Sequence, residues 1–254
     1  MRRREIIGTA VSMTDYEEVL DTIDDAIAAD RRIYICCAPA SSLVFARDDE
    51  ALADAFAHAE IVTPDGMGVV HAARLLGEKL GDRVYGPDLM AAQCKRSAAG
   101  PVRSPIFLYG GHDAKSLDAL RANLSTVFSG IEIAGWHLPP HRDLTPEEEA
   151  AVVAEINASG AKIVWVGIGS PKQELWMRGM RERLDAPVLV GVGAAFDFFS
   201  ARVAQAPGWM QRLSLEWLFR LLQDPARLGK RYLLTLPRFA SLALAQAVRE
   251  RLFR

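Results

Sequence analysis

The sequence predicts an α/β protein: a Rossmann-like parallel sheet with helices on both faces, followed by a helical C-terminal appendage. Short apolar runs alternate with helical segments from residue 33 to residue 192, which is the pattern of a parallel sheet covered by helices. Glycines cluster directly after several of these runs. After residue 200 no further strand pattern appears, and apolar residues recur at helical spacing.

We place strands at the β-branched apolar runs and helices at the segments with helical periodicity. The expected strands are residues 6–11, 33–37, 61–63, 106–109, 131–134, 164–166 and 188–192. The expected helices are residues 15–29, 41–47, 50–58, 69–76, 89–98, 114–128, 145–159 and 171–184. Residues 100–105 and 136–144 are expected loops. We divide the chain into an α/β core, residues 1–200, and an appendage, residues 201–254.

Composition narrows the classes of function. The net charge of −2 over 254 residues argues against a general polyanion binder, so no nucleic-acid partner is expected. Cys36, Cys37 and Cys94 lack metal-site spacing and are expected to be buried thiols in a reducing compartment. The apolar run behind the N-terminal arginines is too short for a signal peptide, and no window reaches the length of a membrane span. We expect a cytoplasmic protein.

Residues 164–174, VWVGIGSPKQE, organise the chain. A buried strand ends in two glycines, and Ser170 and Pro171 can cap and start a helix. The free N–H groups at such a helix start attract anions, above all phosphates. The alternative is a turn that needs glycine only for tight packing. Gln173 and Glu174 one turn into the helix, and a second glycine turn at 191–193, favour a ligand site.

Asp65 is the candidate catalytic carboxylate, because it follows a strand and lies beside Gly66. A carboxylate there could accept a proton from a hydroxyl; the alternative is a helix-capping residue in a Pro-Asp-Gly turn. Asp197 between aromatic residues suits a base- or sugar-binding pocket, or a buried cap. His137 and His141 are four apart, but the prolines between them exclude an aligned metal pair. The sequence has no Gly-x-Ser-x-Gly, Walker or His-Glu-x-x-His motif.

The C-terminal segment is basic. Residues 208–254 carry nine basic and three acidic residues, a net charge of +6 in a protein whose total is −2. Trp209, Trp217 and several leucines recur there at helical spacing. Such a segment is typical of a membrane-surface element or a polyphosphate clamp. The alternative is a helical cap with a solvated basic face. The apolar residues also leave a homo-oligomer open.

Seven segments together resemble one family, the WecG/TagA/CpsF glycosyltransferases (glycosyltransferase family 26), over nearly the whole chain. They are TPDGMGVV (63–70), RVYGPD (83–88), FLYGG (107–111), VGIGSPKQE (166–174), GVGAAFD (191–197), LEWLFR (215–220) and DPARL (224–228). Each segment is weak alone, but their common order is specific.

The resemblance implies an inverting, metal-independent transfer without a cofactor. A sugar would move from a UDP-sugar to a sugar on undecaprenyl diphosphate, at the cytoplasmic face of the membrane, in surface polysaccharide synthesis. Asp65 resembles the family's base, and Arg220, Arg227 and Arg231 are candidates for the acceptor's lipid diphosphate. The expected donor-site residues are Cys37, Arg83, Gly110, Gly111, Gly167, Gly169, Ser170, Lys172, Gln173, Glu174, Gly193 and Asp197.

The chain also departs from the family pattern. The family often has Thr-x-Asn where Cys37-Ala38-Pro39 stands, which favours a neutral hexose such as glucose over N-acetylmannosamine or its uronic acid. It often has Gly and Arg where Ala201 and Gln205 stand, so we expect altered loop geometry or one phosphate contact fewer. Two alternatives follow: a nucleotide-sugar-binding protein without turnover, and a nucleotide-dependent oxidoreductase, although the three-glycine fingerprint of the latter is absent after the early strand.

Overall fold

A computed structural model of the chain describes residues 1–100, 104–212 and 214–252, apart from the side chains of Arg212 and Arg227. It confirms the α/β prediction. Six parallel strands form one sheet. Their order across the sheet is β4 (Ile61–Pro64), β3 (Ile33–Ala38), β8 (Val188–Gly191), β7 (Ile163–Gly167), β5 (Ile106–Gly110) and β6 (Ile133–His137).

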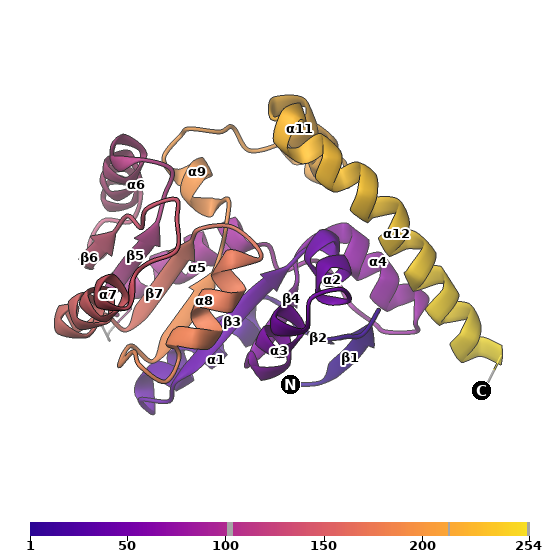
Figure 1. The fold of residues 1–254 in the computed structure, drawn as a ribbon, viewed down its shortest axis with the longest axis horizontal. Coiled ribbons are helices and arrows are strands. Elements are labelled where there is room, and N and C mark those ends of the chain that lie inside the picture. The colour runs from indigo at the N-terminus through magenta and orange to yellow at the C-terminus, as the bar shows by residue number, and fades with distance from the viewer. Residues whose placement is uncertain (101–103, 213, 253–254) are drawn as a thin grey trace.

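Helices cover both faces of this sheet (Figure 1). Alternate strand residues face opposite sides, so Tyr34 and Cys36 join one apolar cluster while Ile33 and Ile35 join the other. The Ile33 side packs against α1 (Tyr16–Ala28), α5 (Gly86–Ala99), α6 (Ala114–Val127) and α9 (Ala195–Phe199). The Tyr34 side packs against α2 (Ala40–Ala46), α3 (Glu50–His58), α4 (Met67–Leu75), α7 (Pro146–Ser159) and α8 (Lys172–Met180).

The N-terminal strand prediction was wrong in form. Residues 6–11 are not one strand, because the chain turns back at Ile7 and Gly8, which both have positive φ values. The result is an antiparallel hairpin of β1 (Arg3–Ile6) and β2 (Thr9–Ser12), separate from the main sheet. The hairpin lies beside β4, where the Val62 backbone N–H donates to Ser12 Oγ at 3.2 Å.

Other boundaries also differ from the sequence prediction. β6 extends to His137, into the expected loop, because its residues continue to pair with β5. Ser170 does not cap α8: the helix begins at Lys172, no side chain caps it, and Ser170 Oγ instead hydrogen-bonds Ser42 Oγ at 2.8 Å. α8 ends at Met180 rather than at residue 184.

The C-terminal segment consists of α10 (Gly208–Arg212), α11 (Glu216–Gln223) and the long α12 (Pro225–Leu252). In Figure 1, α12 (yellow) runs as a rod beside α2 and α4. Pro237 does not interrupt it. Phe239 and Ala243 are buried in the core, and the Gln246 side chain bonds the hairpin at the Ile7 N–H and the Glu5 carbonyl. No helix of the described residues has the length and apolarity to span a membrane.

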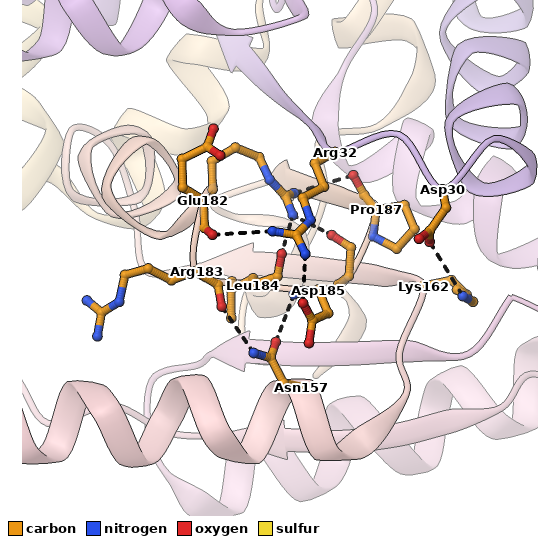
Figure 2. A network of polar contacts seen from close by, with 11 residues as sticks. Asp30, Arg32, Asn157, Lys162, Glu182, Arg183, Leu184, Asp185 and Pro187 are labelled. Atoms are coloured by element: carbon orange, nitrogen blue, oxygen red, sulfur yellow. Dashed lines mark hydrogen bonds and ion pairs between the residues drawn. The ribbon is translucent and has the colours of Figure 1, made fainter.

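A polar network fixes the sheet at the end opposite to the glycine turns (Figure 2). Arg32 bonds the Asp185 carboxylate at 2.7 Å, and Asn157 bonds the backbone of both Asp185 and Arg183. The buried Arg181 guanidinium donates only to backbone carbonyls, including those of Ile33 and Leu184. These bonds satisfy backbone polar groups of the loop between α8 and β8, and so fix the position of α8 relative to the sheet.

Candidate active site

A cleft of about 1260 Å³ opens at the carboxyl ends of the strands. Loops from neighbouring strands leave the sheet toward opposite faces here: the loop after β3 leads to α2, and the loop after β8 leads to α9. Ligands of open α/β sheets bind at such points. The expected site residues that line the cleft are Cys37, Asp65, Arg83, Gly111, Gly167, Gly169, Ser170, Lys172, Gln173, Gly193, Asp197, Arg220 and Arg231.

Gly110 and Glu174 are not among the lining residues, and the side chain of Arg227 lies outside the described residues. A Cβ on Gly110 would stand 2.5 Å from the Gly167 carbonyl oxygen, and the φ of Gly110 is +129°. This glycine therefore allows β5 and β7 to approach closely, which matches the packing alternative for glycine turns.

Asp65 lies where β4 ends and α4 begins. Gly66, with φ +109°, is the N-cap residue of α4, so Asp65 stands one position before the cap of that helix. Burial raises the pKa of the Asp65 carboxyl from 3.8 to about 7, against the opposing charges of Arg83 and Arg220 and together with the like charge of Glu216. A carboxylate with this pKa is suited to accept a proton near neutral pH.

The appendage contributes directly to this part of the cleft. Arg83 forms an ion pair with Glu216 of α11 at 2.7 Å and a hydrogen bond to Gln211 of α10 at 3.2 Å. The Arg83 guanidinium also stacks over the Tyr85 ring, 4.2 Å from its centroid. Arg83 and Glu216 are both largely buried. One region of the cleft thus holds two cations, Arg83 and Arg220, and two carboxylates, Asp65 and Glu216.

Arg231 of α12 reaches a second part of the cleft. Its guanidinium donates to Ser41 Oγ at 3.0 and 3.2 Å and approaches the Ser170 carbonyl at 3.5 Å. It therefore connects the appendage to the start of α2 and to the glycine turn before α8. A cation held at the N-terminal side of α8 adds to the positive potential of that helix end.

The side chains of Gln173 and Glu174 are paired, and Gln173 lies next to the glycine turn at residues 191–193. Gln173 Nε2 donates to Glu174 Oε1 at 3.0 Å, and both side chains are buried. Burial raises the pKa of Glu174, and the bond from Gln173 opposes this. A Cβ on Gly191 would stand 3.1 Å from Gln173 Nε2, so the glycine there leaves space for the amide. Gln173 lines the cleft, and its buried Oε1 has no protein partner.

The loop after β8 carries the remaining candidate. Asp197 on α9 lines the cleft and pairs with Arg202 at 2.8 Å. Ala201 has φ +56°, a conformation that favours glycine. Gln205 lies within 3.5 Å of Asp88 Oδ1 and is not a lining residue. An alanine thus occupies a backbone conformation here that favours glycine.

Several lining residues were missing from the sequence interpretation. Glu216 lies within the LEWLFR segment but was not named as a site residue. Tyr109 and Trp176 stack with ring centroids 4.1 Å apart and form an aromatic wall. Their sequence signals, an aromatic strand residue and an aromatic helix residue, are also those of ordinary core positions, so no local pattern distinguishes them.

The sheet, the cleft and its acid–base group define an α/β enzyme that binds its ligand at the carboxyl ends of the strands. A family model described as "Glycosyl transferase WecG/TagA/CpsF family" matches residues 4–252. The chain therefore belongs to this family, as the sequence resemblance indicated. It is a glycosyltransferase of the group involved in surface polysaccharide synthesis.

Proposed function

We propose that the protein transfers a sugar from a UDP-sugar to a sugar carried on undecaprenyl diphosphate, with inversion at the anomeric carbon and without a metal ion. Asp65 is the proposed catalytic base. The observation that supports this most directly is its position in the cleft, with a carboxyl pKa near 7 and with the guanidinium groups of Arg83 and Arg220 lining the same cleft. Membership of the family implies that the substrates are a sugar donor and a lipid-linked acceptor.

The proposed reaction is a single displacement. Asp65 accepts the proton of the acceptor hydroxyl, whose oxygen forms a new bond to the anomeric carbon. The bond between that carbon and the phosphate oxygen breaks on the opposite side, and UDP leaves with the electron pair. The charge that develops on the diphosphate needs positive potential in a water-poor site. Arg83, Arg220 and the N-terminus of α8 are the groups we assign to this role.

We assign the donor to the side of the cleft formed by the glycine turns. Gly169 and Ser170 offer backbone N–H groups there, and Gln173 offers one amide oxygen without a protein partner. Cys37 and Pro39 line the same cleft. Burial raises the pKa of the Cys37 thiol, so this residue is neutral at physiological pH. A neutral, apolar wall fits a neutral hexose such as glucose better than a uronic acid.

We assign the membrane contact to the appendage. Large apolar side chains are exposed on its helices, among them Trp217 on α11 and Leu233, Leu234 and Leu244 on α12. Exposed apolar groups next to basic residues are typical of helices that lie in the membrane interface. The proposed location is the inner face of the cell membrane, where the lipid-linked acceptor would be available.

The deciding experiment is a panel of UDP-sugars against lipid-diphosphate-linked acceptors, with UDP release and the anomeric configuration of the product as readouts. We expect turnover with one hexose donor, an inverted linkage, and no change on addition of EDTA. Strict magnesium dependence or a retained configuration would contradict the proposal. UDP binding without transfer to any acceptor would favour the non-catalytic sugar-nucleotide-binding protein instead, and a thermal shift with NAD(P) but not UDP the oxidoreductase.

A further inference from the structure

The cleft does not end at the glycine turns and arginines. It continues between α4 and α12 as an apolar trough, whose residues line the same cavity as Asp65 and Arg83. The trough is lined from α4 by Met67, Gly68, His71, Ala72 and Leu75, and from α12 by Leu236, Phe239, Ala240 and Ala243; at the preceding turn of α12 the lining residues are Arg231 and Tyr232. His71 is the polar side chain among the trough residues.

Helical geometry explains the two walls. The α4 residues 67, 68, 71, 72 and 75 follow the pattern i, i+1, i+4, i+5, i+8, so they lie on one face of that helix. The α12 residues 236, 239, 240 and 243 recur at three and four positions and share one face in the same way. A Cβ on Gly68 would stand 4.0 Å from Phe239 Cε1, an ordinary van der Waals distance, so α4 and α12 lie next to each other at this point. Phe239 and Ala243 are buried and form the floor, while Leu75 keeps 37% of its surface exposed.

The trough differs sharply in polarity from the part of the cleft that is lined by Asp65 and the arginines. Asp65 lies directly before α4, and the cation Arg231 of α12 lines the same cavity next to the trough. Beyond Met67 the lining becomes almost entirely hydrocarbon. A ligand that filled both parts would carry a strongly anionic group joined to a flexible apolar chain. The two ends of the cavity therefore match the two ends of a prenyl diphosphate.

The outer surface of α12 supports the same occupant. Leu233 and Leu244 are exposed on the face of α12 next to the trough residues Leu236 and Ala240, and Leu234 is exposed on the opposite side. A helix that lines the trough with one face and presents leucines with the next can pass a hydrocarbon chain from the protein to a lipid phase without exposing it to water.

We infer that the trough between α4 and α12 binds the first isoprene units of the acceptor's prenyl chain. This inference rests on the proposed function and adds a subsite to it. The α4 wall spans Met67 to Leu75, about 12 Å at the rise of an α-helix, so the trough holds only the beginning of a long chain. The remaining isoprene units stay in the bilayer. The chain in the trough fixes the direction from which the acceptor sugar meets Asp65.

Binding of farnesyl diphosphate and of inorganic diphosphate, measured by calorimetry on the full chain, tests this inference without turnover. We expect the wild type to bind farnesyl diphosphate at least ~10-fold more tightly, because burial of each methylene group contributes to affinity. Ala240→Trp fills the trough and should reduce this preference to about 3-fold or less, with unchanged affinity for inorganic diphosphate. Ala245→Trp, on the exposed side of the same helix, should behave as wild type.

A second variant acts from the opposite wall. Leu75→Ser changes a side chain on α4 that is partly exposed and can therefore be replaced by a polar one. This variant should also weaken the binding of farnesyl diphosphate while leaving that of inorganic diphosphate unchanged. Equal wild-type affinity for the two ligands, or a preference that survives both variants, would overturn the inference. So would a dimer in sedimentation that Ala240→Trp dissociates while no prenyl preference exists, because the trough would then bind a second copy of the chain. Sugar transfer with no dependence on isoprenoid length would remove the trough and leave the transferase function intact.

Discussion

The guanidinium of Arg83 and the carboxylate of Glu216 form a largely buried ion pair at 2.7 Å. The pair joins the loop before α5 to α11, so this part of the cleft is built from both the α/β core and the C-terminal segment. Because breaking a buried pair leaves an uncompensated charge, Arg83 and Glu216 together hold α11 against the cleft. Both residues also act on the pKa of Asp65, in opposite directions.

Glu216→Gln should shift the acidic limb of the pH–rate profile to lower pH. Asp65 must be ionised to accept a proton, so activity rises as pH passes its pKa of about 7. The negative charge of Glu216 raises this pKa, and its removal should lower it by roughly 0.5–1 unit. The profile of kcat/KM from pH 5 to 9 measures the shift. An unchanged limb would show that the titrating group is not Asp65.

Arg83→Gln should shift the same limb in the opposite direction. Loss of the nearby positive charge makes the ionised carboxylate less favourable, so the pKa of Asp65 rises and more activity is lost at pH 6 than at pH 9. The matched control is Arg74→Gln on α4, whose guanidinium bonds the Leu80 carbonyl and does not line the cleft. A uniform loss of activity at every pH would assign Arg83 to donor binding alone.

Asp65→Asn should reduce turnover by ~10²–10⁴-fold, the usual contribution of a general base. It should also stabilise the fold at alkaline pH. A raised folded-state pKa contributes stability that is present below the unfolded pKa, near 4, and is lost as pH rises through about 7. Asp65→Asn does not lose this stability, so its unfolding free energy relative to that of the wild type should increase between pH 4 and 7, by on the order of 2–4 kcal/mol.

Urea denaturation at several pH values measures that increase. Asp25→Asn on the exposed side of α1 serves as the control and should give a constant difference across the same range. If Asp65→Asn instead keeps near-normal turnover, or gives the same stability difference at pH 4 and pH 8, the carboxylate is neither the base nor the buried ionisable group described above.

Gly110→Ala should destabilise the fold far more than Gly77→Ala. Both glycines have positive φ, so both variants suffer backbone strain of about 1 kcal/mol. Only at Gly110 would the new Cβ also stand 2.5 Å from the Gly167 carbonyl oxygen, whereas Gly77 has open space. We expect at least ~2 kcal/mol of additional loss at Gly110, measured as a difference in urea unfolding free energy. Equal losses would mean that β5 and β7 adjust without cost.

Leu233→Ser combined with Leu234→Ser should weaken binding to anionic liposomes about 10-fold, since both side chains are largely exposed and offer apolar area to the bilayer. Val127→Ser on α6 also removes an exposed apolar side chain, but far from the appendage, and should leave binding unchanged. Co-sedimentation with vesicles provides the measurement. Point variants are preferable to deletion of α12, because Phe239 and Ala243 are part of the core.

The regular part of the fold could be predicted from sequence because its signals are local. The buried run at β7 and the glycines after it required only short-range patterns, and Asp65 could be placed at the cleft because strand ends of a parallel sheet share one edge. The hairpin was missed since residues 6–11 look like one apolar run, while the turn at Ile7 and Gly8 has no proline or asparagine to mark it.

The contribution of Glu216 could not be predicted in this way. Its role depends on a contact with Arg83, a residue far away in the sequence, and an acidic residue in an amphipathic helix ordinarily faces solvent. The helical continuity of α12 through Pro237 was equally hidden, because a proline normally ends a helix. Here Leu233, whose carbonyl loses its partner, is exposed and can be solvated.

The bonds from Gln246 to Ile7 and Glu5 have a consequence for biosynthesis. Residues 225–252 leave the ribosome after every strand of the sheet has been made, yet they supply Arg231 and one wall of the trough. A nascent chain that has folded its sheet therefore still lacks one wall of the cleft and exposes apolar surface on α2 and α4. We expect enzymatic activity to appear only after α12 has packed against these helices, so the docking of α12 is the last step in forming the cleft.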